Sequence, residues 1–148
     1  MIGCTREGVV YYFENNEMKK EYDNAFNSEE STSLVVCVRK FSKGFIIGSQ
    51  AGDIAMWVRS EENNSTSGKD AYDFIRKIAP SATKNQKILG LSFSINEDSI
   101  IVALSNNNIG LLNVKSIGLN EDTTRDVKFE LVCKGFHSAA ISSVDVAI

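Results

Sequence analysis

A short pattern of apolar residues, a break and more apolar residues recurs three times in this chain and constrains its fold most. The middle copy is FIIGSQAGDIAMWV at residues 45–58, in which β-forming residues flank a glycine-containing break. This pattern predicts two antiparallel strands joined by a tight turn. Similar patterns occur at residues 4–13 and 104–113. Three such hairpins predict a chain that folds mainly into antiparallel β-sheet.

The three copies align on a small hydroxyl residue, which gives the length of the repeat. These residues are Thr5, Ser49 and Ser105, so the spacing is 44 residues from 5 to 49 and 56 residues from 49 to 105. Residues that accept a positive φ follow three positions later, at Gly8, Gly52 and Asn108. Eight positions after the hydroxyl residue come Phe13, Trp57 and Asn113. Repeats of this length indicate a propeller or a solenoid.

Each whole repeat contains four strand candidates. In the middle repeat they are 34–38, 45–49, 54–58 and 72–78, and in the next they are 88–93, 99–104, 109–114 and 127–133. A single four-stranded sheet cannot bury both of its faces, and radial stacking as blades of a β-propeller solves this problem. We therefore expect an all-β fold of antiparallel four-stranded blades. The predicted units are a partial blade at 1–33, blades at 34–87 and 88–140, and the first strand of a next blade at 141–148.

About two and a half units cannot close a ring, since four blades is near the minimum for a propeller. An open array leaves sheet faces and edges exposed, which favours aggregation. We therefore expect either that these residues are part of a longer polypeptide or that a second chain completes the ring.

The composition excludes several classes of function. The formal net charge is -3, which indicates neither a nucleic-acid nor an anionic-membrane partner. Cys4, Cys37 and Cys133 are too far apart for a metal motif or a disulfide framework, so we expect reduced thiols, a cytoplasmic location, no metal and no cofactor. Cys37 lies in the most apolar strand and is predicted to be unreactive. The sequence has neither a secretory pattern nor an apolar run of membrane-spanning length.

Nothing in the sequence predicts catalysis. His137 is the single histidine and no nucleophile pattern accompanies it, so a structural role in a loop is favoured over a general base. Asp145 is interpreted as a polar residue at a contact between blades, and Trp57 as a side chain buried between blades rather than a platform for a ligand. We therefore expect no enzymatic activity and no catalytic residue.

Two polar insertions predict a surface for protein partners. Residues 60–71 and 115–126 connect the third and fourth strands of successive units, so both are expected on the same rim. The candidate docking residues in the first insertion are Glu61, Glu62, Asn63 and Asn64.

The recurring residues resemble the WD repeat, which has a Gly-His pair, a Ser, an Asp and a Trp that hydrogen-bond within a blade. Ser49 and Trp57 match directly, whereas Ala51 stands where the Asp is expected. In the Gly135–His137 stretch one residue separates the glycine from the histidine. The resemblance implies that the structural blade residues are Thr5, Glu7, Phe13, Ser49, Trp57, Ser105, Asn107 and His137.

A narrower resemblance involves the segments 41–48, 58–62, 91–98 and 137–141, which are similar to the family of cilia- and flagella-associated protein 57. It implies a non-catalytic WD-repeat scaffold in the axoneme of motile cilia, with protein partners, that helps to anchor or regulate inner-arm dyneins. The alternatives are a WD-repeat scaffold of another cytosolic complex and, less favoured, a propeller hydrolase or ligand binder. The last predicts carboxylates and aromatic residues clustered at the ring centre.

Overall fold

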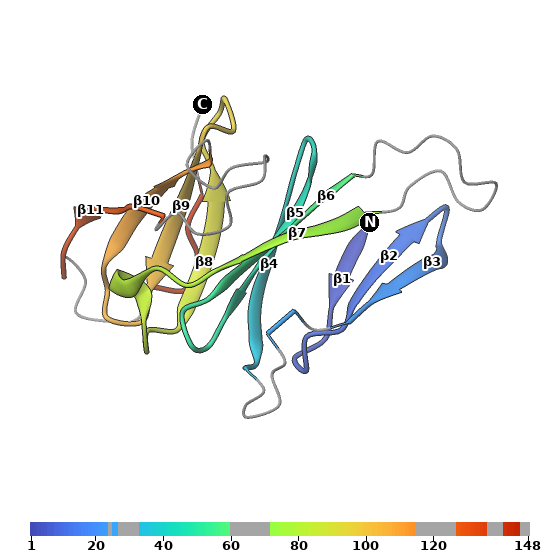
Figure 1. The fold of residues 1–148 in the computed structure, drawn as a ribbon, viewed down its shortest axis with the longest axis horizontal. Coiled ribbons are helices and arrows are strands. Elements are labelled where there is room, and N and C mark those ends of the chain that lie inside the picture. Colours follow the sequence, from blue (N-terminus) through green and yellow to red (C-terminus); the bar gives the residue numbers. More distant parts are fainter. Residues whose placement is uncertain (24, 27–32, 60–71, 115–126, 136–140, 146–148) are drawn as a thin grey trace.

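A computed structural model of the chain shows three antiparallel β-sheets arranged one after another in sequence order (Figure 1). It describes residues 1–23, 25–26, 33–59, 72–114, 127–135 and 141–145. The first sheet has the order β1-β2-β3, with β1 at Ile2–Cys4, β2 at Val10–Glu14 and β3 at Glu17–Tyr22.

The second and third sheets each have four strands. The second has the order β4-β5-β6-β7, with β4 at Val35–Phe41, β5 at Gly44–Ser49, β6 at Ile54–Arg59 and β7 at Tyr72–Ile78. The third has the order β11-β10-β9-β8, with β8 at Ile88–Phe93, β9 at Ser99–Leu104, β10 at Ile109–Asn113 and β11 at Phe129–Cys133. The prediction of all-β, antiparallel four-stranded sheets is confirmed, and the sheets do not close into a ring (Figure 1).

The same five-residue turn joins the strands of the predicted hairpin in all three sheets. The backbone N–H of its first residue donates to the carbonyl oxygen of its fifth at 2.9 Å, and the pairs are Thr5–Val9, Ser49–Asp53 and Leu104–Asn108. The fourth residue has a positive φ, at 94° for Gly8, 98° for Gly52 and 63° for Asn107.

This turn corrects the predicted alignment of the third repeat by one residue. Leu104, not Ser105, is equivalent to Ser49, so the second spacing is 55 residues, from 49 to 104. Ser105 carries a hydroxyl group, as Thr5 and Ser49 do. It is the second residue of its turn, however, whereas Thr5 and Ser49 are the first. It follows that Leu112, not Asn113, is equivalent to Trp57, and Leu112 is fully buried whereas Asn113 is exposed.

The first strands of the two four-stranded sheets carry equivalent β-bulges. The pairing of β4 with β5 shifts between Val35 and Cys37, and the pairing of β8 with β9 shifts between Ile88 and Gly90. Equivalent residues of β4 and β8 are therefore 53 apart, from 35 to 88. Equivalent residues of β5 and β9, and of β6 and β10, are 55 apart. This spacing is larger because the β8–β9 loop is longer than the two-residue β4–β5 turn.

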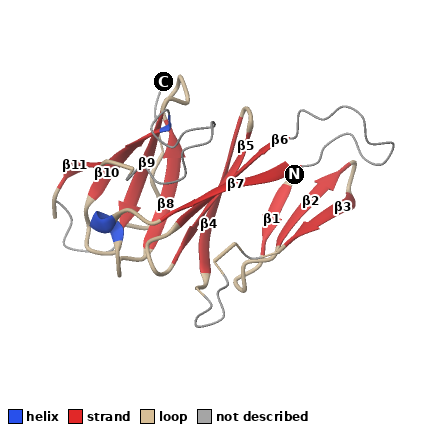
Figure 2. Ribbon diagram, in the orientation of Figure 1, coloured by secondary structure: helices blue, strands red, loops and turns tan. Residues whose placement is uncertain are grey.

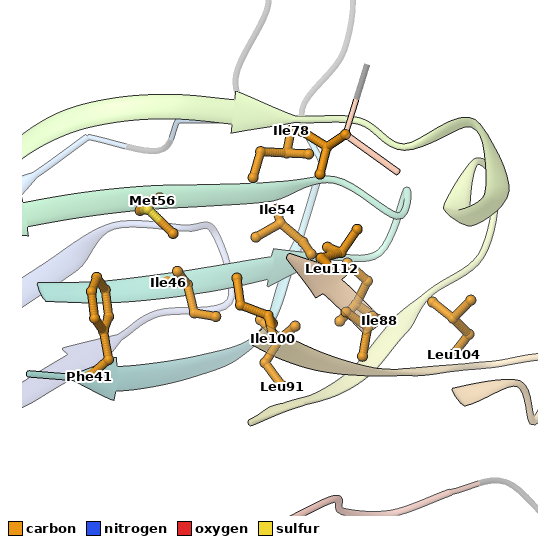
Figure 3. Packing of buried hydrophobic residues seen from close by; sticks show 12 residues of the cluster. Phe41, Ile46, Ile54, Met56, Ile78, Ile88, Leu91, Ile100, Leu104 and Leu112 are labelled. Atoms are coloured by element: carbon orange, nitrogen blue, oxygen red, sulfur yellow. The ribbon is translucent and has the colours of Figure 1, made fainter. Parts of the chain in front are cut away.

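Two hydrophobic clusters hold the three sheets together, and the second sheet contributes to both. Between the first and second sheets lie the side chains of Val10, Tyr12, Tyr22, Phe45, Ile47, Ala55 and Trp57. Between the second and third sheets lie those of Ile46, Ile54, Met56, Ile88, Ile100, Val102 and Leu112 (Figure 3). All six residues of β5 are buried, because successive side chains point to opposite faces and both faces are covered.

Three local features complete the description of the fold (Figure 2). The strand β3 follows β2 directly, because Asn15 and Asn16 both have positive φ and form a two-residue hairpin turn. A short 3₁₀ helix at Ser81–Thr83 lies between β7 and β8. The strand predicted from residue 141 is not formed at 141–145, since these residues have no neighbouring strand of their own unit among the described residues.

Candidate functional site

The strands β4 and β8 are the first strands of their sheets, and they lie next to each other. Gly48 on β5 permits this approach, because a Cβ there would lie only 2.8 Å from Cγ2 of Ile88. The Cys37 thiol on β4 donates to the carbonyl oxygen of Ile88 at 3.9 Å. We call β4 and β8 inner strands. These contacts hold β4 next to β8 at the boundary between the second and third sheets.

Residues 141–145 lie beside β8 as β8 lies beside β4. A Cβ on Gly90 would come within 2.9 Å of Cγ1 of Val144. Val144 is 53 residues after Leu91, which is the spacing that separates equivalent residues of β4 and β8. The segment therefore occupies the place of a third inner strand, although it is not hydrogen-bonded into a sheet.

Three polar side chains at equivalent positions of these segments contact one another, and we call Arg39, Ser92 and Asp145 the inner-strand cluster. Nη2 of Arg39 lies 2.5 Å from Oδ1 of Asp145, in an ion pair. The hydroxyl of Ser92 donates to the same carboxylate oxygen at 3.1 Å and accepts from Nη2 of Arg39 at 3.5 Å. The three positions are 39, 92 and 145, which are 53 residues apart in each step.

A cavity of about 270 Å³ opens beside the inner-strand cluster, and we call it the inner cavity. Its lining consists of Arg39, Lys40, Ser92, Phe93, Ser94, Ile95, Glu97 and Asp145. The carboxylate of Glu97 accepts from the backbone N–H of Ser42 at 2.7 Å and from the Ser42 hydroxyl. This contact ties the β8–β9 loop to the β4–β5 turn, so the wall of the inner cavity is braced across two sheets.

The inner cavity combines both signs of charge with accessible side chains. The side chain of Arg39 is 41% exposed and that of Asp145 is 73% exposed. An ion pair this accessible contributes under about 1 kcal/mol to stability. Its two members can therefore exchange their mutual contact for contacts with a ligand at little cost.

Burial favours the protonated form of the Cys37 and Cys4 thiols. Burial raises the pKa of the Cys37 thiol to about 12, and it raises the pKa of the Cys4 thiol to about 11. Because the thiolate is the reactive form of cysteine, both side chains are poor nucleophiles at neutral pH. This agrees with the prediction that Cys37 is unreactive.

Two of the predicted blade residues stabilise the shared turn. The Ser49 hydroxyl accepts from the backbone N–H of Ala51 at 3.2 Å and of Asp53 at 3.0 Å, and the Thr5 hydroxyl accepts from Val9 N–H at 3.2 Å. Ser105 has a different role, because its hydroxyl accepts from the backbone N–H of Lys87 at 3.0 Å.

The structure does not bring the other predicted residues into one site. Trp57 is 3% exposed and stacks on Phe45 with ring centroids 5.0 Å apart, whereas Phe13 lies partly exposed on the first sheet. Glu7 is exposed, and Asn107 is the turn residue with positive φ. His137 and the docking residues Glu61, Glu62, Asn63 and Asn64 lie outside the described residues, so their roles stay predictions.

Sequence reasoning identified one member of the inner-strand cluster and missed two. The sequence predicts Asp145 at a contact between blades, and its carboxylate contacts Arg39 of the second sheet and Ser92 of the third. Arg39 and Ser92 could have been found from the spacing of 53 residues that relates positions 39, 92 and 145. This spacing appears only when the repeats are aligned on their first strands instead of on their hairpins.

Among the described residues, no group of three or more His, Cys, Asp or Glu side chains is placed to hold a metal ion. In that part of the chain there is also no helix long and apolar enough to cross a membrane.

The fold that these repeats build is that of β-propeller blades. The chain is similar to the β-propeller domain of Cps50 (Swd1) from Myceliophteria thermophila, with a TM-score of 0.64 and 8% sequence identity. The match covers 97% of this chain and 40% of that chain, so these residues span less than half of that domain. Comparison with protein-family models finds no match, and neither does comparison with curated proteins.

Proposed function

We propose that the chain is a non-catalytic scaffold that binds other proteins, and that the inner cavity is a site of binding. The observation that carries the proposal is the position of the inner-strand cluster, in which three successive repeat units present polar side chains to one cavity. Binding residues are often carried on loops that a rigid scaffold positions, and the β8–β9 loop contributes Ser94, Ile95 and Glu97 to this cavity.

The chemistry of the inner cavity favours a peptide that carries both a basic and an acidic side chain. Arg39 and Lys40 can pair with a carboxylate, and Asp145 can pair with a cation. The exposed side chain of Ile95, at 63%, supplies an apolar contact at the same place. Electrostatic complementarity of this kind selects partners more than it raises affinity.

Selection of displayed peptides against the purified chain tests this proposal. We expect enriched peptides with both charges, and we expect Arg39→Ala to weaken their binding about tenfold or more. Lys84→Ala is the matched control, because Lys84 is an exposed cation near the opposite end of β8 and does not line the cavity. Equal loss in both variants, or enrichment of peptides that bind the two variants and the unchanged chain equally, would contradict the proposal.

We also propose that the scaffold serves in the axoneme of motile cilia, where it helps to anchor or regulate inner-arm dyneins. The support is the resemblance at residues 41–48 and 91–98 to the family of cilia- and flagella-associated protein 57. Immunoblots of ciliated cells that produce the protein, separated into soluble and salt-washed axonemal fractions, test this. Retention with the axoneme is the expected result. Recovery in the soluble fraction alone would instead support the scaffold of another cytosolic complex.

A further inference from the structure

The two end sheets of the stack each have one face that no described sheet covers. On the first sheet this face carries Tyr11 and Phe13, and we call it the leading face. On the third sheet it carries Ile101, Ile109 and Leu111, and we call it the trailing face. All five side chains are partly exposed, whereas Val10, Tyr12, Ile100, Val102 and Leu112 on the same strands lie in the clusters between the sheets.

The leading face repeats positions that are buried elsewhere in the same chain. Tyr11 and Phe13 are 44 residues before Ala55 and Trp57, which face the first sheet. They are also equivalent to Gly110 and Leu112, and Leu112 faces the second sheet. In the second and third sheets, the side chains equivalent to those of the leading face therefore pack against the preceding sheet.

The trailing face repeats the other half of that interface. Ile101, Ile109 and Leu111 are each 55 residues after Ile46, Ile54 and Met56, and these three pack against the third sheet. The trailing and leading faces are therefore the two complementary halves of a contact that the chain already makes twice within itself.

The edge strand of the first sheet, β1, is related to residues 141–145 at the other end of the chain. By register, β1 is equivalent to β5, since Cys4 pairs with Val10 as Gly48 pairs with Ile54. Among the residues that the structure describes, the first sheet thus contains no strand equivalent to β4 or β8. Residues 141–145 have the spacing of such a strand, and Ile141 and Val144 correspond to Ile88 and Leu91.

We propose that two copies of this chain associate head to tail into a closed ring of six blades. The trailing face of each copy packs on the leading face of the other, and residues 141–145 then lie beside β1 as an inner strand. The described residues of each copy form three sheets, so two copies give six blades, within the range of four to eight that is typical of propellers. Three copies would give nine. A head-to-tail contact whose rotation closes makes such a ring.

Light scattering during size-exclusion chromatography of the purified chain tests the ring directly. We expect a species of twice the 16.3 kDa chain mass at high concentration and no larger series. A chain that keeps its single mass up to the highest soluble concentration would overturn the proposal and would leave these faces to blades of another polypeptide. An open-ended series of larger species would overturn it as well, since the contact would then not close.

Single substitutions on each face distinguish this specific contact from non-specific association. We expect Leu111→Lys and Tyr11→Lys each to raise the dissociation constant of the dimer about 30-fold or more. Val132→Lys is the control, because Val132 is 60% exposed on β11, the outer edge strand of its sheet. Circular dichroism of each variant confirms that the sheets are retained.

Mixing the two face variants keeps the test decisive. Leu111→Lys retains an intact leading face and Tyr11→Lys retains an intact trailing face, so a mixture can form one undamaged contact. We expect the mixture to associate more tightly than either variant alone. If the mixture associates no better, or if either variant still dimerises like the unchanged chain, then the two faces do not pair with each other and the proposal is wrong.

Discussion

The second sheet and the two end sheets share a strand pattern but differ in how it is buried. Trp57 on the second sheet is 3% exposed, whereas the equivalent Phe13 on the first sheet is partly exposed. Ile46 is fully buried, whereas the equivalent Ile101 on the third sheet is not. The position of a sheet in the stack, more than the type of residue, therefore decides how deeply a side chain is buried.

The largest expected effect comes from truncating equivalent aromatic side chains. We expect Trp57→Ala to lower the free energy of unfolding by about 3–5 kcal/mol, because it removes a side chain packed between two sheets. Phe13→Ala removes less buried surface, and we expect a loss of about 1 kcal/mol. Chemical denaturation, at a protein concentration chosen to lie below that of the proposed association, measures both. Similar losses at the two positions would break the comparison between the middle and end sheets.

Glycine at the shared turn offers a second comparison. Gly52 has a φ of 98°, and a Cβ there would overlap the carbonyl oxygen of Thr83, so we expect Gly52→Ala to cost about 2 kcal/mol or more. The equivalent Asn107 already holds a side chain at a φ of 63°. We therefore expect Asn107→Gly to change the free energy of unfolding by under about 1 kcal/mol. Thermal unfolding of the two variants side by side measures the difference, and equal effects would contradict the strain expected for a Cβ at position 52.

A buried hydroxyl beside that turn gives a smaller effect. The single O–H of Thr83 lies within donating distance of two carbonyl oxygens, that of Gly52 at 2.7 Å and that of Pro80 at 3.0 Å, and Thr83 is fully buried. We expect Thr83→Val to cost about 1–2 kcal/mol, because a buried carbonyl oxygen then loses its donor away from water. Thr5→Val is the matched control, since its hydroxyl supports the equivalent turn of the first sheet at a partly exposed position. A larger loss for Thr5→Val would reverse the expected order.

The smallest effect is a pH dependence that arises from Cys37. Its pKa is raised from 9.0 to about 12 in the folded chain, so above pH 9 the unfolded chain loses the thiol proton while the folded chain retains it. The stability that this thiol contributes is complete below pH 9 and declines as the pH rises toward 12. We expect the difference in unfolding free energy between the unchanged chain and Cys37→Ala to shrink between pH 8 and pH 10. A difference that stays constant would show that Cys37 is accessible to ionisation in the folded chain.

The hairpins could be predicted from the sequence because each depends on residues close together in the chain. The Gly52 turn and the strands beside it are an example. The alignment of the third repeat could not, since Ser105 stands next to the true turn position and carries the expected hydroxyl. Arg39 and Ser92 were not predicted as partners of Asp145 because these contacts join residues 106 and 53 positions apart.

Hydrogen exchange in dilute solution, followed by mass spectrometry of peptides, tests most directly whether these units form a stack with a protected middle sheet. We expect the amides of β5 and β6 to exchange most slowly, since that sheet is covered on both faces. The amides of β2 and β10 are expected to exchange faster, because each belongs to a sheet with one open face. Exchange of β5 and β6 at the rate of β2 and β10 would contradict the stacked arrangement.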